Sequence, residues 1–466
     1  ITGGEFSGDV VNNGEITGGS FFGTLTGNEI QGDLYRTVTF DSDGGSTVAA
    51  QRILRGQKAQ RPAAPTKDGY TFIGWYNKAD LQYINLPEWN FDYPVFENLE
   101  LVAQWMEARP ISTDPITYLD KDGNQQVCTA YTVLTSETKE SILNYADKWY
   151  DLPAGWYVVE GNVTITPRLD THGAVNLILT NGSHLTAEWG IDVKVGDTFT
   201  VYAQSTDEGT MGRLTACLPA DFNLDRMVHY SVWPYSGMAG IGSSARWRAG
   251  NDGIRESEGT IIINGGNIHA KGQQGSSAIG GSDYDCNVSS DGDTPGNLRQ
   301  GGSITINGGI VCTELRTSGG AHLSDSFGIG TCGGNGGSVT INGGTIIAEA
   351  SSSAISSGRG GSITINGGNV TAHGGINRYE NQPLYAIPGN GIGPLEGGSI
   401  TINGGTVKAS SEGDGFGIGG AGVHHTAEMH ITINGGNIET TANRNNAAIG
   451  DKSKHKSSVT ITGGVI

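Results

Sequence analysis

The stretch Ser303-Ile304-Thr305-Ile306-Asn307-Gly308-Gly309 recurs through the second half of this 466-residue chain. Its isoleucines alternate with Ser and Thr, which gives the two-residue period of a β-strand with one apolar and one hydroxylated face. The Asn-Gly-Gly that follows is typical of a turn, because glycine adopts positive φ angles without steric cost. Close copies of this strand and turn lie at 259–266, 338–344, 362–368, 399–405, 431–436 and 458–464.

Each copy opens a unit that contains two further strand-like segments. A second short strand follows the turn, as in Asn369-Val370-Thr371-Ala372, and a third segment reads Ala-Ile-Gly or Gly-Ile-Gly, as at 417–419. The shortest interval between turns is 24 residues, from Asn342 to Asn366, and the longer intervals carry loop insertions. Apolar edges that only the next unit can cover predict a mainly β fold, a right-handed parallel β-helix with three short strands per coil.

Two kinds of polar residue recur at fixed points of each unit, so stacking should align them. We expect the asparagines before the glycine pairs to form an internal ladder of amides: Asn264, Asn307, Asn342, Asn366, Asn403 and Asn434. The outward Ser and Thr of the first strands should form columns on the surface. Such flat hydroxyl grids are similar to ice-binding solenoids, but ordinary sheet-surface threonine, favoured for its β-branched fit, gives the same pattern.

The composition narrows the class of protein. The chain has 76 glycines, 28 Lys and Arg against 47 Asp and Glu, and a formal charge of −19. This negative field should repel nucleic acid and anionic lipid, so we expect neither as a partner. The sequence contains no apolar run of 18 residues, so we expect no membrane insertion. It begins without Met and ends within a repeat, which indicates part of a longer protein.

Degenerate coils can be followed back from the clear repeats to about Trp156, which places the β-helix at 156–466. Residues 107–155 are then a junction. The segment from Ser136 to Tyr150 is the plausible helix there, with Ser136 as its N-cap, and we expect it to cover the first coil. At the other end, Ile-Thr-Gly-Gly occurs at 1–4 and 16–19, which predicts a separate short Gly-rich solenoid repeat at 1–36.

Residues 37–106 break the repeat pattern. The segments Val38–Gly45, Pro65–Tyr76 and Leu101–Trp105 resemble the Listeria–Bacteroides repeat, or internalin B-repeat, family. This resemblance implies a small β-grasp-like module, used as a spacer or interaction unit on bacterial surface proteins, without catalytic residues. The repeats from 156 onward resemble the Gly-rich "carbohydrate-binding" β-solenoid surface proteins of gut Gram-positive bacteria, which implies the same architecture.

Loops inserted after the Ile-Gly segment should emerge on one side of the solenoid. Loops 281–301 and 420–428 are long and enclose shorter ones, so they would border a cleft. The candidate catalytic residues there are Asp283, Asp285, Glu396, His424 and His425, which would suit a glycoside hydrolase or lyase. Asp291 and Asp293 could bind Ca²⁺, and we expect no other cofactor. Solvated loop residues and turn-forming aspartates are the plainer interpretation of both groups.

Aromatic residues in two insertions are the candidate ligand-binding residues. The segment 222–247 contains Trp233, Tyr235 and Trp247, and the loop 374–390 contains Tyr379 and Tyr385. Rings beside polar groups offer the apolar platform and hydrogen bonds that a sugar face needs. The alternative is that these rings pack their own loops onto the coils.

These features favour a non-catalytic extracellular surface protein, secreted or cell-wall-anchored. It would act as a β-solenoid adhesin or stalk that binds a glycan or a protein on a host or neighbouring cell. A β-helix enzyme that acts on polysaccharide is the alternative. A purely structural component is the third possibility, since exposed sheet edges permit self-association into fibres.

Overall fold

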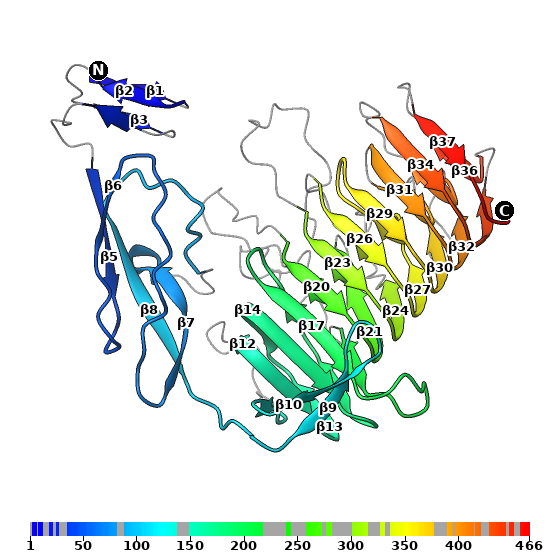
Figure 1. Ribbon diagram of the computed structural model, residues 1–466, viewed down its shortest axis with the longest axis horizontal. Helices are drawn as coiled ribbons and strands as arrows, with labels where there is room; N and C mark the ends of the chain where they lie inside the picture. The colour runs from blue at the N-terminus through cyan, green and yellow to red at the C-terminus, as the bar shows by residue number, and fades with distance from the viewer. Residues whose placement is uncertain are drawn as a thin grey trace, which may run out of the picture. The chain divides into compact units, whose positions relative to one another are not determined.

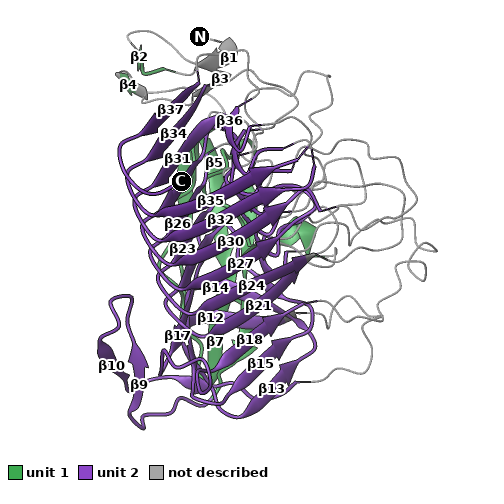
Figure 2. Cartoon of the chain, turned by 90° about the vertical axis from the view of Figure 1, so that its right-hand side faces the viewer, with its two compact units in different colours: residues 1–109, 143–147 green, residues 110–142, 148–466 purple. Residues whose placement is uncertain are grey.

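The structure is a computed structural model. It describes residues 2–6, 8–12, 18–21, 25–27, 35–81, 88–137, 149–217, 239–243, 258–272, 276–281, 301–315, 327–330, 336–376, 389–394, 397–413, 415–420, 428–443, 447–451 and 457–466. The chain forms two compact units (Figure 2), residues 1–109 with 143–147 and residues 110–142 with 148–466. Each unit is described by itself below.

The first unit contains a four-stranded sheet and two small parallel strand pairs (Figure 1). The sheet has the order β6-β5-β8-β7, with a parallel central pair and antiparallel outer pairs, as in a β-grasp. Val38, Trp75 and Leu101 are fully buried in its core. The bounds are β5 Tyr35–Asp41, β6 Gln51–Leu54, β7 Tyr70–Asn77, the 3-10 helix η1 Lys78–Asp80 and β8 Leu99–Glu107.

The N-terminal strand pairs follow the repeat that the sequence shows. Phe6 pairs with Phe21, and Val10 pairs with Leu25, so both pairs have the predicted offset of 15 residues, whereas Thr2 pairs with Gly18 across a register shift. Parallel neighbours at a constant offset are the arrangement of a solenoid. The strands are β1 Thr2–Phe6, β2 Val10–Asn12, β3 Gly18–Phe21 and β4 Leu25–Gly27.

The second unit is a parallel β-helix, as the repeats predict. One long parallel sheet, here called the main sheet, contains the first strand of each coil after β14 (Figure 1). These strands are β17 Thr198–Ala203, β20 Thr260–Ile263, β23 Ser303–Ile306, β26 Ser338–Ile341, β29 Ser362–Ile365, β31 Gly398–Ile402, β34 Met429–Ile433 and β37 Ser458–Ile461.

The second strands of the coils form another parallel sheet, here called the second sheet. Its nine described strands follow chain order without a crossover. They are β13 Asn162–Ile165, β15 His184–Ala187, β18 Arg213–Ala216, β21 Asn267–Gly272, β24 Ile310–Leu315, β27 Thr345–Glu349, β30 Asn369–Gly374, β32 Thr406–Ser411 and β35 Asn437–Ala442.

The Ile-Gly segments form short strands on the third side of the coils. Two long strands, β12 Trp149–Val159 and β14 Arg168–Leu179, join this side to the main sheet, because β14 pairs with β16 at its start and with β17 at its end. The short strands are β16 Ile191–Asp192, β19 Ile241–Gly242, β22 Ile279–Gly280, β25 Ile329–Gly330, β28 Ile355–Ser356, β33 Ile418–Gly420 and β36 Ile449–Asp451.

Apolar and polar residues alternate along the strands, and the apolar side chains of successive coils form one continuous core. Ile304 pairs with Val339, and the row continues through Ile363, Ile400 and Ile431, each no more than 2% exposed. The glycines of the third side have a steric reason. A Cβ atom on Gly280 would lie 1.8 Å from the carbonyl oxygen of Gly330 in the next coil. The close approach of neighbouring backbones therefore requires glycine there.

Two expectations about this unit need correction. The asparagine ladder forms, but along an outer corner rather than inside, because each Asn follows an inward Ile and therefore points outward. The predicted helix at 136–150 is also wrong at its described ends. Glu137 forms a parallel bridge with Ile165, and β12 begins at Trp149, whereas residues 138–148 lie outside the described residues. The sheet therefore includes 149–155, which the sequence assigned to the junction.

Candidate functional site

The residues that the sequence singled out as candidate sites all lie outside the described residues. These are Asp283, Asp285, Asp291, Asp293, Glu396, His424 and His425 for catalysis or metal binding, and Trp233, Tyr235, Trp247, Tyr379 and Tyr385 for ligand binding. Their roles stay predictions. The described residues offer two other features, an aromatic surface patch and a buried charged cluster.

Three rings form the aromatic patch, and they come from distant parts of the chain. Trp156 lies on β12, Tyr202 on β17, and Tyr118 on β9 Ile116–Leu119. The rings of Trp156 and Tyr202 stack with centroids 5.2 Å apart, and Tyr118 lies 4.8 Å from Tyr202 and 5.0 Å from Trp156. All three side chains are partly exposed. The patch therefore presents apolar ring surface to solvent at the first coils of the main sheet.

A β-hairpin holds Tyr118 in place. Strand β9 pairs antiparallel with β10 Gln125–Cys128. The hairpin covers the outer side of Val158 and Ile178, which have no exposed surface. Burial raises the pKa values of Tyr118 and Tyr202 above the ordinary value near 10, so both hydroxyls remain protonated and can donate hydrogen bonds.

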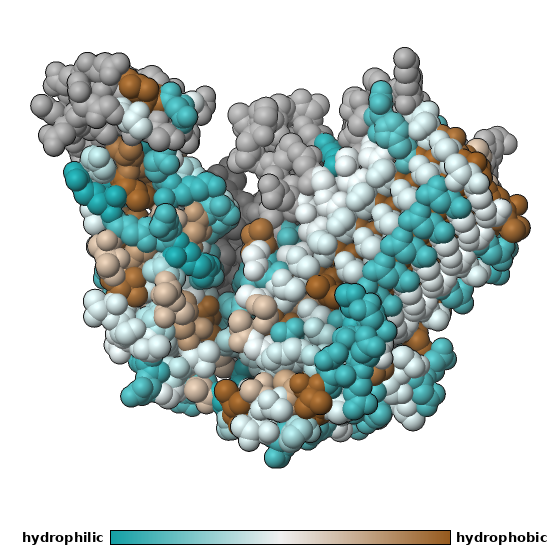
Figure 3. All heavy atoms as spheres, in the orientation of Figure 1, coloured by the Kyte–Doolittle hydropathy of each residue, from teal (hydrophilic) through white to brown (hydrophobic). Residues whose placement is uncertain are grey.

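The patch lies at the end of three columns of mostly hydroxyl and amide side chains, here called the hydroxyl–amide face. The first column is Thr198, Thr260, Ser303, Ser338, Ser362, Ser399, His430 and Ser458. The second is Trp156, Asn176, Thr200, Ile262, Thr305, Thr340, Thr364, Thr401, Thr432 and Thr460. The third is the asparagine ladder, which ends on Thr462. Figure 3 shows parallel rows of differing hydropathy that run across the coils of the β-helix.

The outer side of the second sheet carries charged residues, unlike the hydroxyl–amide face. Lys271 contacts Glu314 at 3.2 Å, and Lys408 contacts Glu439 at 3.0 Å, each pair from neighbouring coils. His269 lies 3.3 Å from the same Glu314. From β20 to β37, the described columns of the hydroxyl–amide face contain no Asp, Glu, Lys or Arg. Two faces of one scaffold thus carry different chemistry.

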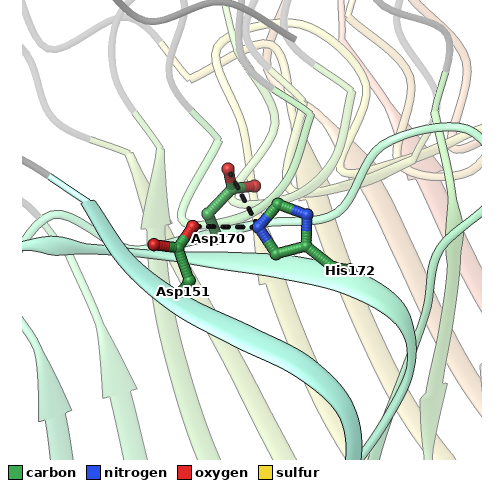
Figure 4. A group of neighbouring side chains, drawn as sticks. All are labelled: Asp151, Asp170 and His172. Carbon is green, nitrogen blue, oxygen red and sulfur yellow. Dashed lines mark hydrogen bonds and ion pairs between the residues drawn. The ribbon is translucent and has the colours of Figure 1, made fainter. Parts of the chain in front are cut away.

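The buried charged cluster lies where β12, β14 and β16 begin on the third side. Asp151, Asp170 and Asp192 are register partners on these three strands. Figure 4 shows His172 directed at two of them, with its Nε2 atom 2.9 Å from Asp151 Oδ1 and 3.7 Å from Asp170 Oδ2. The side chain of His172 is 6% exposed, whereas that of Asp151 is 34% exposed. Only one edge of the cluster therefore faces solvent.

Further charged groups complete this cluster. Lys194 Nζ lies 2.8 Å from Asp170 Oδ1, and Arg168 Nη2 lies 3.5 Å from Asp192 Oδ1. Arg168 also donates to backbone carbonyls of the next two coils, those of Trp189 and Ile191 in one and of Ala239 and Gly242 in the other. Buried charges are tolerated when each has a partner of opposite charge or a hydrogen bond. The ion pairs and hydrogen bonds of the cluster thus link the first coils to one another.

Asp197 is a further buried acid beside this cluster. Its side chain accepts hydrogen bonds from the backbone N–H of Gly173, at 2.6 Å, and from Thr171 Oγ1, at 3.3 Å. Burial raises its pKa to about 6, although Lys194 and the Gly173 hydrogen bond act in the opposite direction. Gly173 has a φ of 79° and lies at the register shift between β12 and β14, so Asp197 stabilises the backbone at this irregularity.

Chemically, two carboxylates and an imidazole form a donor set that a divalent cation accepts. In the structure, however, Lys194 already supplies a cation to Asp170, and His172 bonds Asp151. The arrangement is therefore a buried network of ion pairs. Sequence reasoning missed it because Asp151, Asp170 and Asp192 are spaced unequally along irregular coils. The alternation Arg168, Asp170, His172 around Leu169 was the available signal of an outward polar row.

Comparison with known proteins identifies two repeat types in the chain. Residues 37–104 match the Listeria-Bacteroides repeat domain, and 261–283, 339–359, 363–394 and 400–422 match the beta helix repeat. A "Putative membrane protein" of Evansella cellulosilytica is 37% identical over 70 residues, which are 15% of this chain and 10% of that protein. Internalin H of Listeria monocytogenes is 51% identical over 41 residues, which are 9% of this chain and 7% of that protein. No solved structure matches.

The chain thus spans a tenth or less of the length of either curated relative. Among the described residues, no helix is long and apolar enough to cross a membrane. The Listeria-Bacteroides repeat and the beta helix repeat indicate a surface or extracellular protein.

Proposed function

We propose that this chain is a non-catalytic surface protein that binds glycan, with the patch of Tyr118, Trp156 and Tyr202 as the anchor. The observation that carries this proposal is the stack of Trp156 on Tyr202, partly exposed and beside the neutral hydroxyl–amide face. A sugar ring has one apolar C–H face and a rim of hydroxyls. Aromatic surface flanked by a few polar groups suits both parts of the ring.

Polar groups next to the patch support this assignment. Asn176 is the register partner of Trp156, and it accepts a 3.5 Å hydrogen bond from the Tyr202 hydroxyl. Thr200 follows Asn176 in the same column but is only 4% exposed, so Asn176 is the polar group that lies accessible beside the rings. Amide and hydroxyl groups beside a ring can both donate to and accept from sugar hydroxyls. In this proposal the module at 37–104 spaces or presents the β-helix on a cell wall or a secreted assembly.

A glycan array tests the proposal, with reducing-end release measured for every glycan that binds. We expect binding without release, and loss of binding in a Trp156→Ala variant. Tyr93→Ala is the matched control, because Tyr93 is an aromatic residue of the first unit that is 51% exposed. Circular dichroism and a melting curve establish that both variants fold. A folded Trp156→Ala variant with undiminished binding, or binding to proteins alone, contradicts the proposal.

The row of Asp151, Asp170 and Asp192 supports a second candidate function, cleavage of polysaccharide. Asp151 and Asp170 offer oxygen atoms within 4.8 Å of each other and of His172, and paired carboxylates are the usual machinery for glycoside cleavage. Asp192, by contrast, has no exposed surface. Sugar release that disappears in an Asp151→Asn variant, while binding is retained, would establish this function in place of the first.

A further inference from the structure

We infer that the ligand of the hydroxyl–amide face is a neutral, unbranched polysaccharide that lies along the coil axis, about one sugar per coil. This inference rests on the proposed function, since it names the class of glycan bound at the same site. Four observations support it: the spacing of the columns, the fixed direction of the asparagine ladder, the absence of Asp, Glu, Lys and Arg from the described columns of β20 to β37, and their continuity with the aromatic patch.

The spacing follows from the parallel sheet. Register pairs Thr305 with Thr340 and Thr340 with Thr364, so identical hydroxyls recur at every coil. Neighbouring strands lie about 4.8 Å apart, so each column offers a hydroxyl or amide at about that interval. An extended β-linked chain advances by a similar distance with each sugar. A polymer laid along the columns would therefore meet an equivalent set of groups at each residue.

The amide ladder has a fixed polarity, which gives the surface a direction. Asn342 Nδ2 donates to Asn307 Oδ1, and Asn366 Nδ2 donates to Asn342 Oδ1, each at 2.7 Å. Every amide of the ladder is therefore held in one orientation by its neighbours. Each side chain retains one further N–H and one further lone pair for a ligand. A polymer with its own chemical direction can match such an array at every coil.

The lack of charge favours a neutral polymer. The chain as a whole has a formal charge of −19, yet the three columns carry no carboxylate and no ammonium group among the described residues of β20 to β37. Among the described residues of these columns, only His430 could offer an acidic polysaccharide a cationic partner, and it lies 3.9 Å from Glu428. The rest of the molecule would repel such a polymer. The second sheet, which carries Lys271, Glu314, Lys408 and Glu439, shows that the scaffold accommodates charge elsewhere.

Continuity with the patch sets where the polymer is anchored. Trp156, Asn176 and Thr200 begin the column that continues as Thr305 and Thr340. Thr200 is only 4% exposed, so the accessible groups of this column are Asn176 and the residues from Ile262 onward. A chain stacked on Trp156 is thus already aligned with the threonines. Ile262 interrupts the hydroxyls at one coil only and offers an apolar contact there. Each added sugar should therefore contribute binding free energy, so affinity should rise with chain length.

Calorimetric titration with oligosaccharides of defined length tests the inference. The probes are β-1,4-linked gluco-, manno- and xylo-oligosaccharides of two to eight sugars, with oligogalacturonates of equal lengths as charged probes. We expect affinity for one neutral series to rise at least tenfold from two to eight sugars, without measurable binding of the galacturonates. The Thr340→Lys substitution should lower the affinity for the octasaccharide at least tenfold and leave the affinity for the disaccharide unchanged. Thr371→Lys is the matched control, because Thr371 is exposed on the outer side of the second sheet.

The outcomes separate the inference from the proposed function. Binding that is lost in Trp156→Ala but does not depend on chain length, or on Thr340→Lys, overturns the inference and leaves the proposed function intact. Preferential binding of the galacturonates overturns the inference in the same way. Absence of binding to every probe and every array glycan overturns both.

Discussion

The side-chain amide of Asn307 donates to Oδ1 of Asn264 at 2.7 Å, although 43 residues separate the two. The same bond recurs at each following coil as far as Asn434. The ladder therefore aligns coils whose loops differ in length. Because each amide both donates and accepts, a residue that only accepts must break the ladder.

We predict that Asn342→Asp lowers the stability of the β-helix by about 1 to 2 kcal/mol at neutral pH. The carboxylate cannot donate to Asn307 Oδ1 and places a negative charge beside it. Asn369→Asp, an exposed asparagine at the start of β30, is the control and should change stability little. Urea unfolding followed by circular dichroism gives both values. Equal effects of the two substitutions would mean that the ladder adds no stability.

Substitution by alanine should destabilise the protein very differently at two adjacent isoleucines of β27. Ile346 has no exposed surface and packs in the core, whereas Ile347 points outward and is 41% exposed. Ile346→Ala should cost about 2 to 5 kcal/mol, and Ile347→Ala within about 0.5 kcal/mol. Thermal melts of the two variants under the same conditions measure the difference. A reversed order would place the wrong face of this strand in the core.

Glycines of the third side and of loops should respond differently to substitution by alanine. Gly280 has a φ of 127°, and its Cβ would meet Gly330 O at 1.8 Å, so Gly280→Ala should cost upwards of about 4 kcal/mol or prevent folding. Gly182 has a φ of 74° with nothing within 4 Å of its Cβ, so Gly182→Ala should cost about 1 to 2 kcal/mol. The yield of soluble protein and the melting temperature of each variant measure the two effects. A well-folded Gly280→Ala variant of undiminished stability would contradict the close backbone approach.

Asp197 should make stability depend on pH. Its pKa is about 6 in the folded protein against an ordinary value of 3.8, so the folded chain holds this proton more tightly than the unfolded chain. The stabilisation by protonation is complete below pH 3.8 and is lost as the pH rises through 6, at a cost of roughly 3 kcal/mol. Asp197→Asn should therefore raise the melting temperature at pH 8 and have little effect at pH 4.

The matched control for this pH dependence is Asp114→Asn, which removes an exposed carboxylate elsewhere in the same unit. Its effect on the melting temperature should be small at both pH values. If Asp197→Asn destabilises the protein at pH 8 as much as at pH 4, then the hydrogen bonds to Thr171 and Gly173 outweigh the cost of burying the charge.

The sequence predicted the coils because each one repeats a local pattern. Ile304 and Ile306 mark the inward face, and Gly308 and Gly309 mark the turn, so period and turn chemistry are sufficient to derive the parallel stack. The same reasoning placed the asparagine ladder inside, although strict alternation after Ile306 directs Asn307 outward. The position of Asn307 in the strand, and not the amide character of its side chain, decides which side it faces.

The candidate sites depended on contacts that a local pattern does not encode. Tyr118 lies in a hairpin far from Tyr202 in sequence, and their rings meet only because the hairpin packs on Val158 and Ile178. Likewise, His172 meets Asp151 only because the strands β12 and β14 pair in the register that places Asp151 opposite Asp170. Composition and spacing drew attention to aromatics and acids in long loops instead, because there no strand pattern competes for them.

The unequal spacing of the asparagines has a consequence for how such a chain changes over time. Register across the coils is the same whether 24 residues or 43 separate successive ladder positions, since each bond joins residues that are neighbours only in the stack. A duplicated or deleted coil would therefore leave every surviving column in alignment. Length along the axis, and with it the number of subsites for a polymer, can vary by recombination between homologous coils while the contents of each loop diverge independently.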